Sequence, residues 1–249
     1  MTNSKKYFIE ISYKGTNYHG WQIQPNAITV QEVLDKALGT FFRQKVETLG
    51  CGRTDTGVHA TQFFAHFELL TEINNGEKAL QSINSLLPYD ISIHRIVETK
   101  PEAHARFDAT LRSYEYHIHY AKNPFLHGLS WLVRDKLNVA AMNEAASQLL
   151  SYTDFSCFSK SNTQVFTNNC KISRAEWVET KEGLIFHISA DRFLRNMVRA
   201  IVGTMVDIGR EKLSSDEIHD IIKSKNRSNA GASVPACGLY LTRIKYPYI

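Results

Sequence analysis

The sequence of 249 residues lacks the features by which metal-binding and disulfide-linked proteins are recognised. It has few cysteines, and no two of them form a Cys-x-x-Cys pair: Cys51, Cys157, Cys170 and Cys237. The ten histidines are scattered, and none pairs with another at the spacing of a zinc motif. A chain of this length needs no disulfides for stability, so we expect reduced thiols, as in the cytoplasm, and no metal site.

Long apolar runs are missing too. No stretch approaches the ~18 consecutive apolar residues of a membrane-spanning helix. Residues 1–6 lead into a strand-like run without the apolar segment of a secretory signal. A strong excess of one charge is also absent, since the net charge is only +4. We expect a cytoplasmic protein without membrane contacts, and the mild basic excess is compatible with a nucleic-acid partner without establishing one.

What the sequence does have is enough apolar material, 43% of its residues, for one large or two modest cores. In the first half, β-forming runs alternate with segments of helical periodicity. Thr29 and Glu32 form a capping box at the start of the first helix. The predicted strands cover 7–13, 46–49, 62–70 and about 91–97, and the predicted helices cover 30–42 and 77–87. This β-α-β-β-α-β order is that of the ferredoxin-like unit, an antiparallel sheet with helices on one face.

The second half repeats this order. The predicted strands cover 113–120, 171–179, 184–190 and 239–246, and the predicted helices begin after Asn138, at residue 193 and after residue 214. Two insertions, 121–135 and 153–169, interrupt the repeat. We therefore expect an α+β fold of two ferredoxin-like halves, 1–108 and 109–249, with mainly antiparallel sheets flanking a central active-site cleft.

The stretch from 52 to 60 (Gly-Arg-Thr-Asp-Thr-Gly-Val-His-Ala) does not resemble a packing element. Its two glycines permit positive φ or a close approach to a ligand, and loops between rigid elements often carry chemistry. Asp55 is the first catalytic candidate. Asp-Thr-Gly is equally good turn chemistry, so this stretch alone leaves an active site and an ordinary polar turn equally open.

Three other stretches stand out: 104–116 at the boundary between the halves, the arginine-rich 192–199, and 236–241 at the start of the last predicted strand. In the second, the spacing predicts that Arg192, Arg195 and Arg199 share one face of a helix near its N-terminus. Cations oppose the helix dipole there. A negatively charged group, either a carboxylate or phosphates, would therefore have to stabilise these arginines at that position.

Taken together, these stretches resemble the tRNA pseudouridine synthase A (TruA) family, in the family's order and over nearly the whole chain. The resemblance is carried by residues 13–15, 18, 20–22, 29–31, 52–60, 104–107, 112–114, 197–199, 201–203 and 238–241. Cys51 and Thr56 stand where the family most often has alanine, and both are small enough to leave the catalytic assignment intact. Lys14 stands where aspartate is common, which leaves the role of that turn open.

The resemblance implies that the protein is an isomerase that converts uridine to pseudouridine at positions 38–40 of the tRNA anticodon stem-loop. The uracil leaves its N1–C1′ bond and is reattached through C5, so no cofactor is expected. The step needs an ionised carboxylate beside the sugar, and the match assigns this role to Asp55. The sequence leaves open whether Asp55 attacks C1′, adds to C6 or removes the C2′ proton. It also leaves open which tRNAs are modified and how three neighbouring positions are accepted.

The resemblance also implies roles for further residues. Arg199 matches the partner that keeps the catalytic carboxylate charged, and Arg53 matches the residue that fills the space left by a flipped base. Tyr114 matches a tyrosine that stacks on the target base, and Leu239 lines the uracil pocket. His59 and Thr54 are expected to shape the loop. Candidates for phosphate contacts, chosen by charge and position only, are Arg112, Arg192, Arg195, Lys223, Lys225 and Arg227. The family implies a homodimer that cradles one tRNA.

Two alternative functions are compatible with parts of the sequence. Asp-Thr-Gly is also the aspartic-protease triplet, but that chemistry needs two carboxylates that share a proton, and the predicted helices contradict an all-β fold. A non-catalytic RNA-binding protein is the second alternative, because ferredoxin-like sheets often bind RNA through stacked aromatic residues. It leaves the Asp55 loop and its expected arginine partner unexplained.

Overall fold

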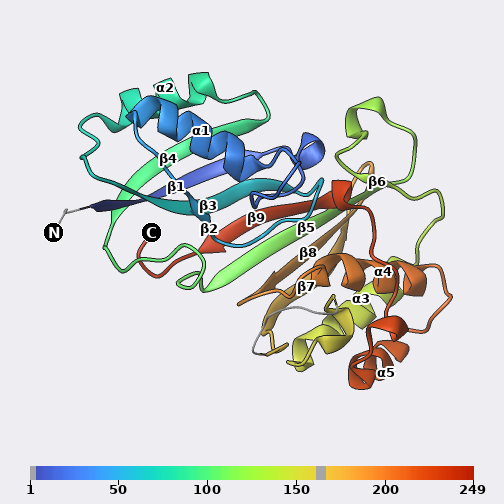
Figure 1. Cartoon of the computed structure of the whole chain (residues 1–249). Coiled ribbons are helices and arrows are strands. Elements are labelled where there is room, and N and C mark those ends of the chain that lie inside the picture. Colours follow the sequence, from blue (N-terminus) through green and yellow to red (C-terminus); the bar gives the residue numbers. More distant parts are fainter. Residues whose placement is uncertain (1–3, 161–166) are drawn as a thin grey trace. The chain divides into compact units, whose positions relative to one another are not determined.

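The computed structural model describes residues 4–160 and 167–249 (Figure 1). Residues 161–166 of the predicted insertion 153–169, and the first three residues of the predicted N-terminal segment, lie outside the described part. Contacts divide the chain into a first unit, Met1–Thr110 with Leu241–Ile249, and a second unit, Leu111–Tyr240. The sequence predicts that the last residues belong to the second half, whereas contacts group 241–249 with the first unit.

The first unit has the predicted order of elements. These are β1 (Lys5–Tyr13), α1 (Val30–Phe42), β2 (Leu49–Gly50), β3 (His59–Leu69), α2 (Gly76–Leu86) and β4 (Ile91–Thr99). Strand β1 pairs antiparallel with both β3 and β4, and β2 pairs with β3. Both helices lie over one face of these strands (Figure 1). The order β-α-β-β-α-β is confirmed here.

Strand β2 is shorter than the predicted 46–49, because the backbone before it bonds to helix α1. The backbone N–H and the hydroxyl of Thr48 donate to Oδ1 of Asp35, at 3.0 and 2.6 Å. The Thr48 carbonyl accepts from Nε2 of Gln31 at 2.5 Å. Thr48 therefore takes its partners from side chains of α1, and only Leu49 and Gly50 pair with β3. The Thr29 half of the predicted capping box is confirmed, since its Oγ1 accepts from the Glu32 N–H at 3.3 Å.

The second unit follows the same order with two additional short elements. Its elements are β5 (Leu111–His119), β6 (Trp131–Leu132), α3 (Val139–Gln148), β7 (Ile172–Glu179), β8 (Gly183–Ala190), α4 (Met197–Gly209) and α5 (Glu217–Ser224). The additional elements are β6, which follows β5, and α5, which follows α4. The last strand, β9 (Leu239–Lys245), begins in this unit and continues into the first. Strand β8 pairs antiparallel with β5 and β7, and the short β6 pairs parallel with β5. The mixed α and β composition with mainly antiparallel strands confirms the predicted fold class.

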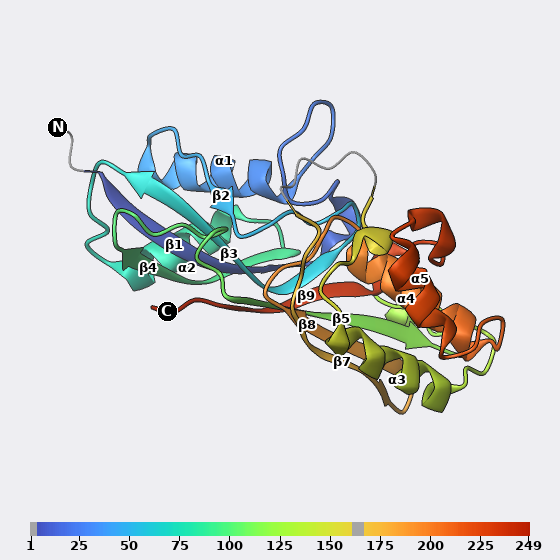
Figure 2. The same ribbon diagram turned by 90° about the horizontal axis from the view of Figure 1, so that it is seen from below.

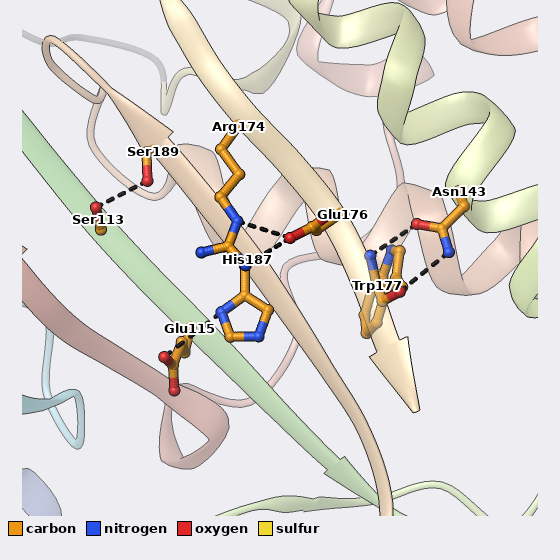
Figure 3. Close-up of polar contacts among 8 residues, drawn as sticks. All are labelled: Ser113, Glu115, Asn143, Arg174, Glu176, Trp177, His187 and Ser189. Atoms are coloured by element: carbon orange, nitrogen blue, oxygen red, sulfur yellow. Dashed lines mark hydrogen bonds and ion pairs between the residues drawn. The ribbon is translucent and has the colours of Figure 1, made fainter. Parts of the chain in front are cut away.

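The two faces of the β5-β8-β7 sheet differ in character. On one face Tyr116, Trp177 and Phe186 are buried, and Trp177 and Phe186 stack with ring centroids 4.8 Å apart. Helix α3 lies along β7 and packs against α4 (Figure 2). It is fixed by Asn143, whose Oδ1 accepts from the Trp177 N–H at 2.7 Å and whose Nδ2 donates to the Trp177 carbonyl at 3.0 Å (Figure 3).

Polar pairs occupy the alternate positions of the same strands. The hydroxyls of Ser113 and Ser189 are 2.8 Å apart (Figure 3). Oε2 of Glu115 lies 2.9 Å from Nε2 of His117, and its Oε1 lies 3.5 Å from Nδ1 of His187. The imidazoles lower the pKa of Glu115, chiefly through the hydrogen bond with His117. The alternation is therefore that of a sheet with one apolar and one polar face.

Helix α4 begins four residues later than predicted, and this corrects the expected arginine face. Residues 192–196 are irregular, and Asn196 has a φ of +66°. The carbonyl of Arg195 accepts from the Lys160 N–H at 3.2 Å, outside any helical pattern. Arg192 and Arg195 precede the helix, so the prediction that they share a helical face with Arg199 is wrong.

Candidate active site

The Asp55 loop, residues 52–58, connects β2 to β3. Asp55 is half-buried, and its carbonyl accepts from the Val58 N–H at 3.1 Å, which closes a turn. Gly57 occupies this turn with a φ of +79°, a conformation that favours glycine. Arg53 is exposed on the same loop. The loop thus presents a carboxylate and a guanidinium two residues apart on an ordered turn.

Buried polar contacts hold both ends of this loop. The hydroxyls of Tyr13 and Thr54 are 2.9 Å apart, and both side chains are buried. At the other end, Nδ1 of the buried His59 accepts from the Gly15 N–H at 3.0 Å. An Nδ1 that accepts a hydrogen bond is unprotonated. These contacts support the expectation that Thr54 and His59 shape the loop.

Two glycines let another stretch of backbone lie directly against the loop. A Cβ on Gly15 would lie 1.9 Å from the Val58 carbonyl oxygen, and one on Gly20 would lie 2.2 Å from that of Thr54. Gly20 also has a φ of +84°. The Trp21 N–H donates to the Thr54 carbonyl at 3.4 Å. The motif from 15 to 21 is therefore a backbone support for the Asp55 loop.

The other predicted site residues lie in the second unit. Tyr114, on β5, is half-buried and meets Phe193 edge-to-face, with centroids 5.1 Å apart. Arg199 is in the first turn of α4, and its Nε donates to the Val234 carbonyl at 2.7 Å. Leu239 is buried at the start of β9. Because Asp55 and Arg53 belong to the first unit, the meeting of all five residues at one site stays a prediction from the resemblance.

The candidates for phosphate contacts differ in their surroundings. Nη1 of Arg227 donates to two carbonyls and Nη2 to the Ser233 hydroxyl, at 3.0–3.2 Å. Nζ of Lys225 lies 2.8 Å from Oδ2 of Asp154. Nη1 of Arg112 donates to a carbonyl at 2.9 Å. These three cations therefore have partners within the protein. Arg195 and Lys223 are exposed, and Arg192 is half-buried.

Asp90, which the sequence does not single out, contacts the segment that supports the Asp55 loop. It lies in the connection between α2 and β4 and accepts the Tyr18 hydroxyl at 2.5 Å. Its sequence context, Leu-Pro-Tyr-Asp, is typical of the end of a helix followed by a turn. No local signal connects it to a residue 72 positions earlier.

Across residues 4–160 and 167–249, no group of three or more His, Cys, Asp or Glu side chains is arranged to hold a metal ion. Over the same residues, no helix is both long and apolar enough to cross a membrane.

Comparison with known proteins supports the resemblance. A family model described as tRNA pseudouridine synthase matches residues 145–247. The tRNA pseudouridine synthase A of Bacteroides fragilis is 50% identical over 244 residues, which cover 98% of this chain and 97% of that protein. The chain belongs to the tRNA pseudouridine synthase A family. The enzyme of that name from Bacteroides thetaiotaomicron is 50% identical over 98% of this chain and 91% of its own length. A more distant family member, from a Thermoanaerobacter species, is 41% identical over 97% of this chain and all of its own length.

Proposed function

We propose that this protein converts uridine to pseudouridine at positions 38–40 of the tRNA anticodon stem-loop, in the cytoplasm. Family membership over nearly the whole chain supports the reaction and the tRNA substrate. The observation that carries the catalytic assignment is the Asp55 loop. It presents a half-buried carboxylate on a turn fixed at both ends by buried hydrogen bonds, as catalysis by a positioned group requires.

The reaction is an isomerisation, so atoms and electrons balance within the nucleotide. The N1–C1′ bond breaks, the uracil turns, a C5–C1′ bond forms, the C5 proton leaves and N1 gains a proton. No oxidant, reductant or water is consumed, and no cofactor is proposed. Asp55 acts as an ionised carboxylate beside the sugar, which is the role of the nucleophile in retaining glycoside hydrolysis.

The remaining roles follow the family match. A uracil within a stem must leave the base stack to reach Asp55, and Arg53 is proposed to occupy the vacated space. Tyr114 stacks on the flipped base, where one such contact is worth ~1–3 kcal/mol. Leu239 supplies an apolar wall, and Arg199 keeps the Asp55 carboxylate charged. A homodimer that binds one tRNA is part of the proposal, and sedimentation of the protein with and without tRNA tests it.

The decisive experiment maps pseudouridine in unmodified tRNA incubated with the protein and no added cofactor. The wild type is expected to modify positions 38–40, and Asp55→Asn is expected to lower kcat by at least about a thousandfold, as loss of a nucleophile does. Thr56→Ala is the matched control, because this exposed neighbour stands where the family most often has alanine.

Two outcomes would contradict the proposal. Wild-type rates in Asp55→Asn would remove Asp55 from the chemistry. Wild-type protein that binds tRNA but forms no pseudouridine would favour the non-catalytic RNA-binding alternative.

A further inference from the structure

The segment from Lys14 to Tyr18 follows β1 in the sequence and packs against the backbone of the Asp55 loop. The N–H of Tyr18 donates to the Gly15 carbonyl at 3.0 Å, which closes the segment into a short 3-10 turn. Gly15 and Tyr18 are both buried. The Tyr18 carbonyl accepts from the Gly57 N–H of the loop at 3.2 Å, and the Gly15 N–H donates to His59, the first residue of β3, at 3.0 Å.

Asp90 holds the same segment through three further hydrogen bonds. Oδ1 accepts the Tyr18 hydroxyl at 2.5 Å, and Oδ2 accepts from Nδ2 of Asn17 at 3.2 Å. The Asp90 carbonyl accepts from the Lys14 N–H at 2.9 Å. One residue thus binds three of the five residues of the segment, with both carboxylate oxygens and its backbone.

The bond between Tyr18 and Asp90 has a fixed direction. Burial and the carboxylate beside it both raise the pKa of Tyr18, burial being the larger cause, so the phenol stays protonated and donates. A hydrogen bond to an ionised acceptor is roughly twice as strong as one between neutral groups. The contact therefore restrains the ring of Tyr18, whose own carbonyl holds Gly57.

We propose that Asp90 is a positioning residue for the Asp55 loop, acting through Tyr18 without touching the substrate. This inference rests on the proposed role of Asp55. The turn that follows Asp55 is closed by its own carbonyl and the Val58 N–H, and the adjacent Gly57 N–H is anchored on Tyr18. Release of Tyr18 frees one side of this turn, so the Asp55 carboxylate is held less well at its working position. A displacement of about 1 Å can lower a rate about a hundredfold.

The test compares Tyr18→Phe, Asp90→Asn and the double variant in pseudouridine formation. Tyr18→Phe removes only the hydroxyl. Asp90→Asn keeps the size but replaces one acceptor oxygen by a donor, which conflicts with Tyr18 or Asn17. We expect each single variant to lower kcat about 10- to 100-fold. KM for tRNA should change less than about threefold, and the double variant should be no worse than the poorer single variant, because both changes break the same contact.

The control is Tyr7→Phe. Tyr7 is also buried in the first unit, and its hydroxyl accepts from the Ile73 N–H at 3.2 Å, in a contact without a link to the Asp55 loop. Tyr7→Phe should lower Tm, because it also loses a buried tyrosine hydroxyl, and should leave kcat unchanged. A second readout does not depend on activity: the Gly57 amide should exchange its hydrogen faster in Tyr18→Phe and Asp90→Asn than in Tyr7→Phe.

The outcomes separate this inference from the proposed function. If the wild type is active and Asp55→Asn inactive, but Tyr18→Phe and Asp90→Asn match Tyr7→Phe in kcat and in Gly57 exchange, the positioning role is wrong and the role of Asp55 stands. The positioning role would also be wrong if kcat/KM fell entirely through a higher KM, or if the effects of the two substitutions were fully additive in the double variant. Failure of the wild type to form pseudouridine would instead refute the proposed function.

Discussion

Arg227 supports the segment that holds Arg199. Its guanidinium donates to the carbonyls of Ala230 and Gly231 and to the hydroxyl of Ser233. The same hydroxyl accepts from Nδ2 of Asn196, the residue just before α4. The next residue in the chain, Val234, accepts from Nε of Arg199 through its carbonyl. Arg227 therefore fixes 230–234, and through them the start of α4 and the guanidinium of Arg199.

Substitution of Arg227 separates this structural role from a phosphate contact. Arg227→Ala is expected to lower the free energy of unfolding by about 1–3 kcal/mol, which corresponds to a fall in Tm of several degrees for a chain of this size. Arg227→Lys should not restore it, because one ammonium cannot reproduce a planar fork of donors. Thermal unfolding of both variants beside Lys223→Ala, an exposed cation nearby, checks this. Full rescue of stability and tRNA affinity by lysine would instead support a phosphate contact.

At the residue scale, the sequence indicates which residues are candidates for a site but not which groups they contact. Asp55 and its flanking glycines could be singled out because they form a local pattern in the sequence. Arg227 and Lys225 looked alike as surface cations, yet one bonds within its own loop and the other pairs with Asp154. Asp90 carried no signal, because its contact with Tyr18 spans 72 positions. Such partners depend on tertiary structure, which charge and spacing do not contain.

The loop from 103 to 108, between β4 and β5, is organised around two neutral imidazoles. Nδ1 of the buried His66 accepts from the Ala105 N–H at 3.1 Å. Nδ1 of His104 accepts from the N–H groups of Arg106 and Phe107, at 3.1 and 3.3 Å. Burial lowers the pKa of His66 to about 4 and also lowers that of His104. Protonation at Nδ1 would replace an acceptor by a donor and break these bonds.

The stability of this element should depend on pH below neutrality. The folded-state pKa of His66 lies below the unfolded value near 6.5, so between about pH 4 and 6.5 the unfolded state binds more protons. Stability is therefore expected to fall by up to about 3 kcal/mol as pH drops through that window. Charges of both signs, on Lys6, Glu68 and Asp108, face His66 and modify the shift.

Urea unfolding at pH 7 and pH 4.5 measures this dependence. In His66→Asn the amide oxygen can take the place of Nδ1 as acceptor without titrating, so the variant should lose stability less steeply as the pH falls. Equal pH dependence of wild type and His66→Asn would show that His66 is not the responsible group.

At the element scale, periodicity predicted which helices and strands exist but not where each one ends. The apolar spacing of Leu194, Met197 and Ile201 is helical, yet the helix begins only at Met197. Leu194 is buried from irregular backbone, and Asn196 adopts the left-handed conformation beside Ser233. A residue can thus contribute to the core at helical spacing without being in the helix. The backbone's partners decide the boundary, and they come from distant segments.

For the whole molecule, the repeated β-α-β-β-α-β order was predictable, and the membership of the last strand was not. Residues 241–249 group with the first unit because their partners lie there. The Ile244 N–H donates to Oε1 of Gln62 at 2.8 Å, and the Tyr246 hydroxyl donates to the Ala105 carbonyl at 2.5 Å. These contacts join positions more than 100 residues apart. Position along the sequence alone groups such a strand with the half that precedes it.

Binding of tRNA by the whole molecule is expected to weaken with salt, because each phosphate contact contributes about −0.7 to −0.9 to the slope of log K against log salt concentration. The exposed Lys223 and the ion-paired Lys225 allow a matched test. Lys223→Ala should make the slope shallower by nearly the contribution of one phosphate contact. Lys225→Ala should change it less, because its ammonium is held by Asp154, whose pKa the contact lowers to about 2. Filter binding across a salt series measures both slopes, and a flat response in the wild type would exclude a phosphate track altogether.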